Sequence, residues 1–339
     1  MTRAVPTPVI RIAQERDVDA VLRLAVAGGQ GLTNLPPDRA ALAKRIAASE
    51  RAVAGTAGRE EGSAVLLVAE FDDEIVATGM IFARVGAEWP FYSYRITRQA
   101  SLSQSLGRSK AQRMLNLVND FDGETEVGGL FVDPARRGLA LGRLMARARY
   151  LFIARHRSWF HNRVIAELRG YQDEAGRAPV WEAIGRHFYD MDFHEADRTG
   201  AIHGNQFIAD FGPRHPIYLS MLPADAQAAF GRPHDDGRRA RDMLLTEGFR
   251  DECYVDIFDG GPTLVADIDA VRTVRQAEHL AVAALGEADE LVLASAGEAE
   301  TFRAASGKVR RGAEGLTIEP SLAAALGVGR DDALCLAPA

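Results

Sequence analysis

The sequence contains only two cysteines, Cys253 and Cys335, among its 339 residues. They form neither the closely spaced pairs of a zinc site nor the framework of a disulfide-rich domain. We therefore expect no bound metal, and so little cysteine is typical of a reducing compartment. The chain also lacks an apolar run long enough to span a membrane, and residues 1–10 lack the apolar core of a signal peptide. These absences predict a cytoplasmic protein that has no membrane partner.

The sequence also lacks an excess of positive charge. Its 47 acidic residues outnumber its 40 basic residues, and the formal net charge is −7. A general nucleic-acid-binding protein normally carries a basic excess, so we expect no nucleic-acid partner. A small anionic ligand needs only a local basic pocket and stays compatible with this composition. The length is sufficient for two domains with sizeable cores.

The most informative stretch runs from Leu130 to Met145 and reads LFVDPARRGLALGRLM. It begins inside an apolar run of strand type, residues 127–132, which Pro134 brings to an end because proline cannot donate to a ladder. From Leu141 onward, apolar residues recur at helical spacing. The pattern therefore predicts a strand, a tight turn and a helix. Free N–H groups at the start of such a helix are suited to hold a phosphate.

The turn in this stretch, residues 137–142 (RGLALG), resembles the acetyl-CoA-binding turn of the GNAT acyltransferases, R/Q-x-x-G-x-G/A. The resemblance implies that backbone N–H groups of the turn hold the coenzyme A pyrophosphate, and Arg143 adds positive charge beside it. Ala140 stands where glycine is usual, and an alanine can keep the turn if its φ is negative. The N–H groups of Leu130 and Val132 either polarise the thioester carbonyl or simply complete the sheet. The residues expected to bind the acyl-CoA are Leu130, Val132, Arg137, Gly138, Leu139, Ala140, Leu141, Gly142 and Arg143.

Further blocks make the similarity more specific, because they resemble the arginine N-succinyltransferase family. These blocks are residues 31–36, 90–95, 147–154, 164–170, 188–193, 213–218 and 254–263. The resemblance implies transfer of succinyl from succinyl-CoA to the α-amine of L-arginine. Succinyl-CoA is then a co-substrate, and no permanently bound cofactor is expected. The resemblance also implies that Leu130 contacts succinyl-CoA and that His234 donates a proton.

The expected elements follow the order of a GNAT domain. They are a strand at 9–13, helices at 17–27 and 38–53, a hairpin of strands at 64–70 and 74–85, and a strand at 91–96. The fold class is therefore α/β (α+β), with a GNAT-like mixed sheet flanked by helices, a second α/β half and a small β-rich C-terminal appendage. We expect an acyl-CoA-binding domain at 1–195, a region contributing the catalytic loop at 196–262, and the appendage at 263–339.

Acyl transfer to an amine requires a neutral amine, donors for the tetrahedral oxyanion and a proton for the thiolate. Many GNAT enzymes place a tyrosine acid five residues before a Gly-Phe pair, but counting back from Phe193 gives Phe188, with Tyr189 next to it. His234 would by itself be read as a surface residue. The missing tyrosine and the family position favour it as the acid, since histidine titrates near neutrality. His187 lies on a predicted helix, and its side chain is expected to serve in packing.

Several questions stay open at the level of sequence. The guanidinium of arginine requires a planar carboxylate, and Glu167, Glu182 and Asp256 are candidates that fit a structural role equally well. The amine could instead be ornithine or another amine. A different class of function is a non-catalytic acyl-CoA-binding subunit of a heteromer. The expected assembly is either a homo-oligomer or a heteromer with a related subunit.

Overall fold

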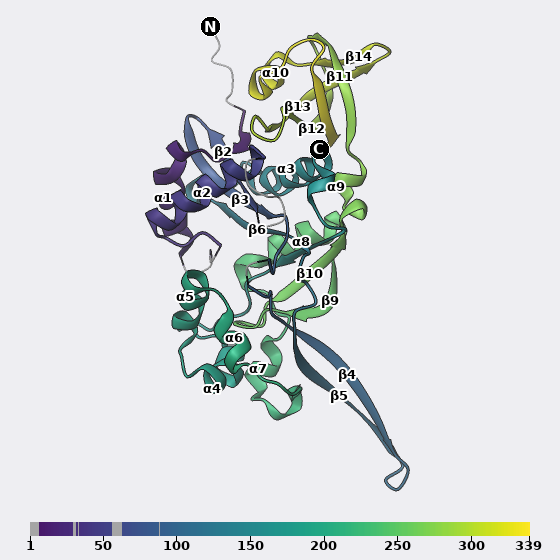
Figure 1. Cartoon of the computed structure of the whole chain (residues 1–339). Helices are drawn as coiled ribbons and strands as arrows, with labels where there is room; N and C mark the ends of the chain where they lie inside the picture. The colour runs from purple at the N-terminus through teal and green to yellow at the C-terminus, as the bar shows by residue number, and fades with distance from the viewer. Residues whose placement is uncertain (1–6, 30–31, 33, 56–62, 88) are drawn as a thin grey trace. The chain divides into compact units, whose positions relative to one another are not determined.

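The structure is a computed structural model that describes residues 7–29, 32, 34–55, 63–87 and 89–339 (Figure 1). Residues 31 and 33 of the block 31–36 lie outside this described part. The chain forms two compact units: the first comprises the residues up to Arg84, Thr125–Asn162 and Asp267–Ala339, and the second comprises Val85–Glu124 and Arg163–Ala266. These units do not coincide with the expected divisions at 195 and 262. One physical reason is strand pairing, since Ile10 near the N-terminus pairs with Ala304 near the C-terminus.

The first unit contains a sheet with the neighbours β1-β2-β3-β6, all antiparallel. Its strands are β1 (Val9–Ile12), β2 (Ala64–Phe71), β3 (Glu74–Phe82) and β6 (Thr125–Val132), and its helices are α1 (Val18–Gly28), α2 (Arg39–Val53) and α3 (Leu141–Arg155). Met80 packs in the apolar cluster under α1 and α2, whereas a Cβ at Gly79 would lie 2.7 Å from Met145 Sδ on α3. Alternate strand residues point to opposite faces, so helices cover both faces of this sheet. The expected mixed α/β fold is confirmed.

The C-terminal strands of the first unit form a closed barrel. They are β11 (Glu278–Leu285), β12 (Glu290–Ala296), β13 (Arg303–Gly312), β14 (Gly315–Ile318) and β15 (Ala333–Pro338), with α10 (Pro320–Leu326) packed against them. The order β12-β15-β11-β14-β13 closes because β12 also pairs with β13. The region is β-rich as expected. Its link to β1 through β13 makes it part of the first unit.

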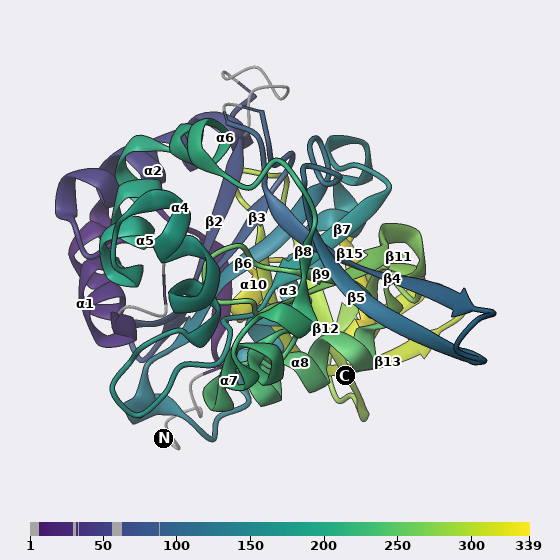
Figure 2. The ribbon, with the colours of Figure 1, turned by 90° about the horizontal axis from the view of Figure 1, so that it is seen from below.

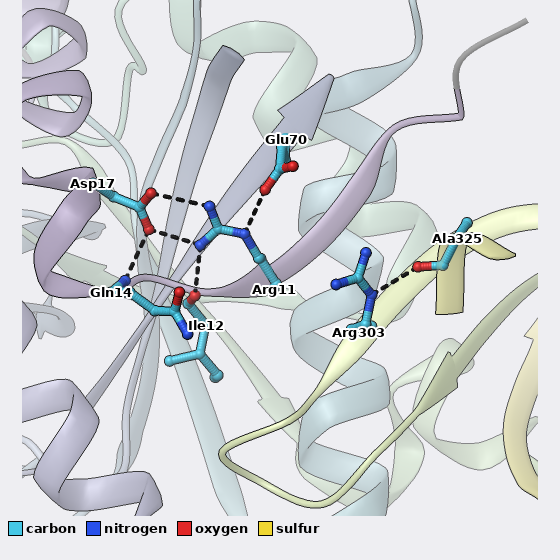
Figure 3. A network of polar contacts seen from close by, with 7 residues as sticks. All are labelled: Arg11, Ile12, Gln14, Asp17, Glu70, Arg303 and Ala325. Carbon is cyan, nitrogen blue, oxygen red and sulfur yellow. Dashed lines mark hydrogen bonds and ion pairs between the residues drawn. The ribbon is translucent and has the colours of Figure 1, made fainter. Parts of the chain in front are cut away.

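A buried ion-pair network connects β1 to its surroundings (Figure 3). Arg11 donates to Asp17 at 2.7 Å and to Glu70 at 2.6 Å, and it also donates to the carbonyl of Ile12. Although burial disfavours a charged carboxylate, the Arg11 guanidinium and the Gln14 amide lower the pKa of Asp17 below its ordinary value. Removal of one partner would leave the other charge buried, so the network holds the first strand in place.

The second unit has the strand order β7-β10-β9-β4-β5-β8. Its strands are β4 (Ser93–Ser103), β5 (Arg108–Val118), β7 (Arg163–Glu167), β8 (Ile217–Tyr218), β9 (Arg250–Val255) and β10 (Pro262–Asp267). The helices α4 (Arg186–Tyr189), α5 (Phe193–His203) and α6 (Gln206–Phe211) lie close together (Figure 2). With α7 (Ala224–Ala229) they share a core around Trp181. A further helix is α8 (Arg238–Glu247).

In the second unit, Asp192 caps α5, whose first residue is Phe193, by accepting from Glu195 N. The strand expected at 91–96 is the start of β4, which extends to Ser103 and pairs along its whole length with β5. No helix in the described part of the chain is long and apolar enough to cross a membrane.

Candidate active site

The turn between β6 and α3 has two residues with positive φ. Gly138 has φ +99° and Ala140 has φ 56° and ψ 13°. The condition of a negative φ at Ala140 is therefore not met: the alanine occupies the left-handed region, where a Cβ costs about 1–2 kcal/mol. The turn is kept in spite of this cost, because Leu141 directly after it is anchored in the core with 1% exposure.

The N-terminus of α3 presents unpaired backbone donors. The Leu144 N–H bonds to Ala140 O at 3.0 Å, which leaves the N–H groups of Leu141, Gly142 and Arg143 without an intrahelical acceptor. No side chain caps this end, and its first turn contains no acidic residue. The positive end of the helix dipole therefore faces outward beside exposed residues of the turn. An anion suits this place.

The arginines around the turn differ in availability. Arg136 forms an ion pair with Glu74 at 2.7 Å, so its charge is already balanced. Arg137 and Arg143 are exposed and form no ion pair with another described residue. The local field is therefore positive, and it comes from the helix end and these two side chains. Packing does not require a glycine at position 142, because a Cβ there would lie 3.7 Å from Val132 Cγ2, an ordinary contact distance.

The strand β6 carries a bulge next to Leu130. The register with β3 passes from the Thr78–Phe131 pair to the Met80–Gly128 pair, so Gly129 and Leu130 lie opposite one residue of β3. Gly129 has φ +57°. The Asp133 N–H donates to Val76 O at 2.9 Å. Because hydrogen-bonded and non-hydrogen-bonded pairs alternate, the adjacent Val132–Ala77 pair is a non-hydrogen-bonded one. The N–H of Val132 therefore points away from β3.

A buried polar cluster fixes the bulge, and the sequence reasoning missed it. Arg149 Nη1 donates to Gly128 O at 3.1 Å, and Thr78 Oγ1 donates to Gly129 O at 3.1 Å. Burial raises the pKa of Glu126 to about 7, against the opposing charges of Arg149 and Arg45. The available signal was Arg149 itself, a charged residue inside an apolar helical pattern. These two hydrogen bonds fix the carbonyl groups of Gly128 and Gly129, and they thereby hold the neighbouring Leu130 in position.

His234 lies in the second unit and caps a short 3-10 turn (Asp235–Gly237). The ring Nδ1 of His234 accepts from the Asp236 N–H at 3.2 Å. The backbone N–H of His234 donates to Arg169 O at 2.8 Å. An Nδ1 that accepts places the proton of the neutral ring on Nε2. The side chain is 25% exposed. His234 therefore presents an Nε2–H group from a backbone that is held in place.

Asp259 anchors Gly170, whose backbone pairs with the residue before His234. Gly170 forms a bridge with Pro233, next to His234. One carboxylate oxygen of Asp259 accepts from Gly170 N at 2.7 Å, and the other accepts from Gly261 N at 2.9 Å. A Cβ at Gly170 would lie 2.5 Å from Asp259 O, so the backbones cross too closely for any other residue.

A second carboxyl group, Asp256, lies beside Asp259. Its Oδ1 accepts from the N–H groups of Phe258 and Asp259 at 2.7 and 2.8 Å. Burial and the neighbouring Asp259 carboxylate raise the pKa of Asp256 well above its ordinary value. The protonated form of Asp256 is therefore favoured more than that of an exposed aspartate. Asp256 serves its own loop, which removes it from the candidate partners of a guanidinium.

The other residues considered from sequence are placed as follows. Tyr189 is buried and stacked on Trp181 at 5.4 Å, and its hydroxyl has no hydrogen-bond partner among the described residues. Phe188 and His187 are exposed, so the expected packing of His187 is wrong. Glu182 forms an ion pair with Arg186 one turn away.

Glu167 is the remaining acid of the three. It lies half-buried at the end of β7 and accepts a hydrogen bond from Thr263 Oγ1 at 3.3 Å. The acyl-CoA residues lie in the first unit and the histidine lies in the second.

Comparison with known proteins gives consistent matches. The family model of the arginine N-succinyltransferase beta subunit matches residues 8–273. The arginine N-succinyltransferase subunit beta of Pseudomonas aeruginosa is 36% identical over 275 residues, which are 81% of each chain. The arginine N-succinyltransferase of Citrobacter koseri is 40% identical over 275 residues, covering 81% of this chain and 80% of that protein.

A solved structure agrees over the full length. The arginine/ornithine succinyltransferase subunit AI of Pseudomonas aeruginosa superposes with a TM-score of 0.88 and 31% identity, covering 98% of this chain and 99% of that one. The match therefore includes the C-terminal barrel, beyond the range of the family model. The chain belongs to the arginine N-succinyltransferase family and is an acyltransferase.

Proposed function

We propose that this chain transfers the succinyl group of succinyl-CoA to the α-amine of L-arginine, giving N2-succinyl-L-arginine and coenzyme A. The observation that carries the proposal is the uncapped N-terminus of α3 behind a positive-φ turn, in a chain of this family. The C–N bond forms as the amine attacks the thioester carbonyl, and the C–S bond breaks as the thiolate leaves.

The turn supplies the binding site for the phosphates of coenzyme A. The N–H groups of Leu141, Gly142 and Arg143 point out of the helix end, and Arg137 adds charge. Leu130 and Val132 lie on the preceding strand at and after the bulge, where the acyl end of the same molecule is expected. The N–H of Val132, which faces away from β3, is the donor assigned to the thioester oxygen.

His234 is assigned the proton transfer. Its neutral ring donates from Nε2, and the protonated ring has the Asp236 carboxylate 3.8 Å from Nδ1 as a counter-charge. The imidazolium releases its Nε2 proton to the departing thiolate of coenzyme A, and the proton that the attacking nitrogen loses as the amide forms restores the imidazolium. Support also comes from elimination, since the hydroxyl of Tyr189 is enclosed in the core of its unit.

Glu167 is the acid assigned to the substrate guanidinium. Of the three candidates, Glu182 is paired with Arg186 and Asp256 serves its own loop, whereas Glu167 lies half-buried at the end of β7 and accepts a hydrogen bond from Thr263 at 3.3 Å. A carboxylate matches the planar fork of a guanidinium. The same acid would attract the side-chain ammonium of ornithine without this geometric match.

One experiment tests the reaction and the identity of the amine. Purified chain is assayed for thiol release with L-arginine and L-ornithine, each against succinyl-CoA and acetyl-CoA. We expect arginine with succinyl-CoA to give the highest kcat/KM, because a site built for a carboxylate leaves buried polar groups unpaired with acetyl-CoA. A preference for ornithine would make ornithine the substrate in place of arginine. The solved relative is named for both amines.

The same assay tests whether the chain acts alone. The Pseudomonas relative is named as a subunit, whereas the Citrobacter relative is named as the enzyme. Activity of the isolated chain would support a complete catalytic unit. Acyl-CoA binding without turnover would instead indicate the non-catalytic subunit of a heteromer. A cytoplasmic location is supported by the low cysteine content.

A further inference from the structure

A two-stranded ribbon extends outward from its base in the second unit. Residues 98–113 form the outer part of the β4–β5 hairpin, here called the arm (Figure 1). At its base β4 pairs with β9 through Tyr94 and Arg95, and β5 pairs with β8 through Met114 and Leu115. Beyond these residues the two strands pair only with each other in the described register.

The arm has no core of its own. Its residues are exposed apart from Ser103 and Gln112, and both faces of the ribbon lie open. Leu102 near its end is 71% exposed and Leu106 in its turn is 64% exposed. A two-stranded ribbon alone is only marginally stable in water. An extended ribbon with apolar side chains at its end therefore indicates a surface that another molecule covers.

The charge of the arm points to the chemistry of that molecule. The arm contains four cations and no acid: Arg98, Arg108, Lys110 and Arg113. Arg98 and Arg113 lie directly opposite each other in the register, and like charges at such a pair are destabilising. None of the four forms an ion pair with another described residue. An external carboxylate between the two guanidinium groups would remove this repulsion.

The pair pattern selects one face of the arm. Ala100 pairs with Ala111 and Leu102 pairs with Ser109, so these residues share a face with the opposed arginines. The opposite face carries the Gln99–Gln112 pair and the other two cations, Lys110 and Arg108, each of which lies opposite a serine and not opposite another cation. A groove of about 420 Å³ lies at the base, between Lys110–Arg113 of β5 and residues of α7 and the turn before it. The contact face is thus two arginines bounded by small apolar residues and Leu102.

We propose that the arm docks on an acidic surface of a second copy of this chain. The whole chain has a formal net charge of −7 and the arm contributes +4, so the remainder of the chain carries −11. A second copy therefore offers the charge that the arm lacks. In a two-fold symmetric dimer each arm reaches the other copy, and the contact is made twice. The proposal does not depend on the acyl-transfer reaction.

The test is the association state of the full chain, measured by sedimentation velocity over a range of concentration and salt. We expect a dimer at micromolar concentration whose dissociation constant rises with ionic strength, because charge pairs are screened. The double variant Arg98→Gln/Arg113→Gln should raise the dissociation constant at least tenfold, about 1.4 kcal/mol. The matched control is Gln99→Glu/Gln112→Glu, which changes the net charge by the same amount on the opposite face and should leave dimerisation unchanged.

A shortened chain makes the result independent of single contacts. Thr97 and Met114 are a register pair, so replacing residues 98–113 by Asn-Gly closes a two-residue hairpin at that pair. This variant should be monomeric with an unchanged circular dichroism spectrum. A wild-type chain that stays monomeric, or a dimer that survives removal of the arm, would overturn the proposal. So would a monomer whose arm retains a fluorescent DNA duplex, which would assign the arm to nucleic acid.

Discussion

The substitution Asp259→Asn probes how the histidine is positioned. Each oxygen of Asp259 accepts one backbone N–H, from Gly170 at 2.7 Å and from Gly261 at 2.9 Å. An asparagine offers one acceptor and one NH₂ group, so one of these buried N–H groups loses its partner. The expected cost is about 1–3 kcal/mol of stability. Because Gly170 is bridged to Pro233, next to His234, the loss also releases the histidine.

The kinetic consequence follows from this geometry. A displacement of about 1 Å at a catalytic group can cost on the order of a hundredfold in rate. We expect kcat to fall by about tenfold to a hundredfold, whereas KM for succinyl-CoA should not change, since the proposed phosphate turn lies in the first unit.

Asp256→Asn is the matched control. Its amide oxygen can accept from Phe258 N and Asp259 N, as the carboxyl oxygen does, and its NH₂ group adds no negative charge beside Asp259. Activity should therefore persist. An acid whose folded-state pKa is raised stabilises the fold below its unfolded pKa and loses this contribution as pH rises through the folded pKa. In Asp256→Asn this fall in stability with rising pH should be absent. Urea unfolding at a series of pH values measures it. Wild-type kcat and stability in Asp259→Asn would refute the reasoning.

Four further substitutions test the remaining parts. His234→Ala should lower kcat by about a hundredfold with acyl-CoA binding retained, and wild-type turnover with an unaltered pH profile would contradict its role. Gly142→Asp should raise KM for succinyl-CoA at least tenfold by repelling phosphate, about 1.4 kcal/mol, while Gly142→Ala measures the effect of a Cβ that the protein itself accommodates at 3.7 Å. Ala140→Gly should stabilise the fold by up to about 1 kcal/mol in urea titrations, and a loss of stability would contradict the left-handed turn. Asp17→Asn should cost about 3 kcal/mol at neutral pH. Since the pKa of Asp17 is lowered in the fold, the deficit should shrink as pH falls through that pKa, where the wild type loses the same contribution.

The strand, turn and helix of the phosphate site could be predicted because their signals are local. Pro134 ends the strand, and the apolar spacing after Leu141 defines the helix. The observed bounds, β6 ending at Val132 and α3 beginning at Leu141, agree with that pattern. The loop histidine could be chosen only through the family resemblance, since its surroundings come from Arg169 and Asp236 on separate segments.

Other features could not be predicted because partners distant in sequence decide them. The arm has polar residues on both faces, so residues 98–113 show no alternation that would predict a strand. The bulge at Gly129 depends on a register with β3, although two successive glycines in a strand were a usable signal. The closure of the barrel requires β12 to meet β13 as well as β15, which no single segment encodes.

Several exceptions to local rules lie in or next to the segments at the end of β6. Gly129, Gly138 and Ala140 have positive φ, and Arg149 is a charged residue in the core of the unit. Each is unfavourable alone, and together they lie within the two segments that meet at the turn. Strained or polar features persist where the surrounding structure enforces them, and they concentrate at functional sites. Here the nearly fully buried α3 enforces them: its packing fixes the turn, and Arg149 on its inner side fixes the bulge. One helix therefore sets both the phosphate end and the acyl end of the proposed coenzyme site.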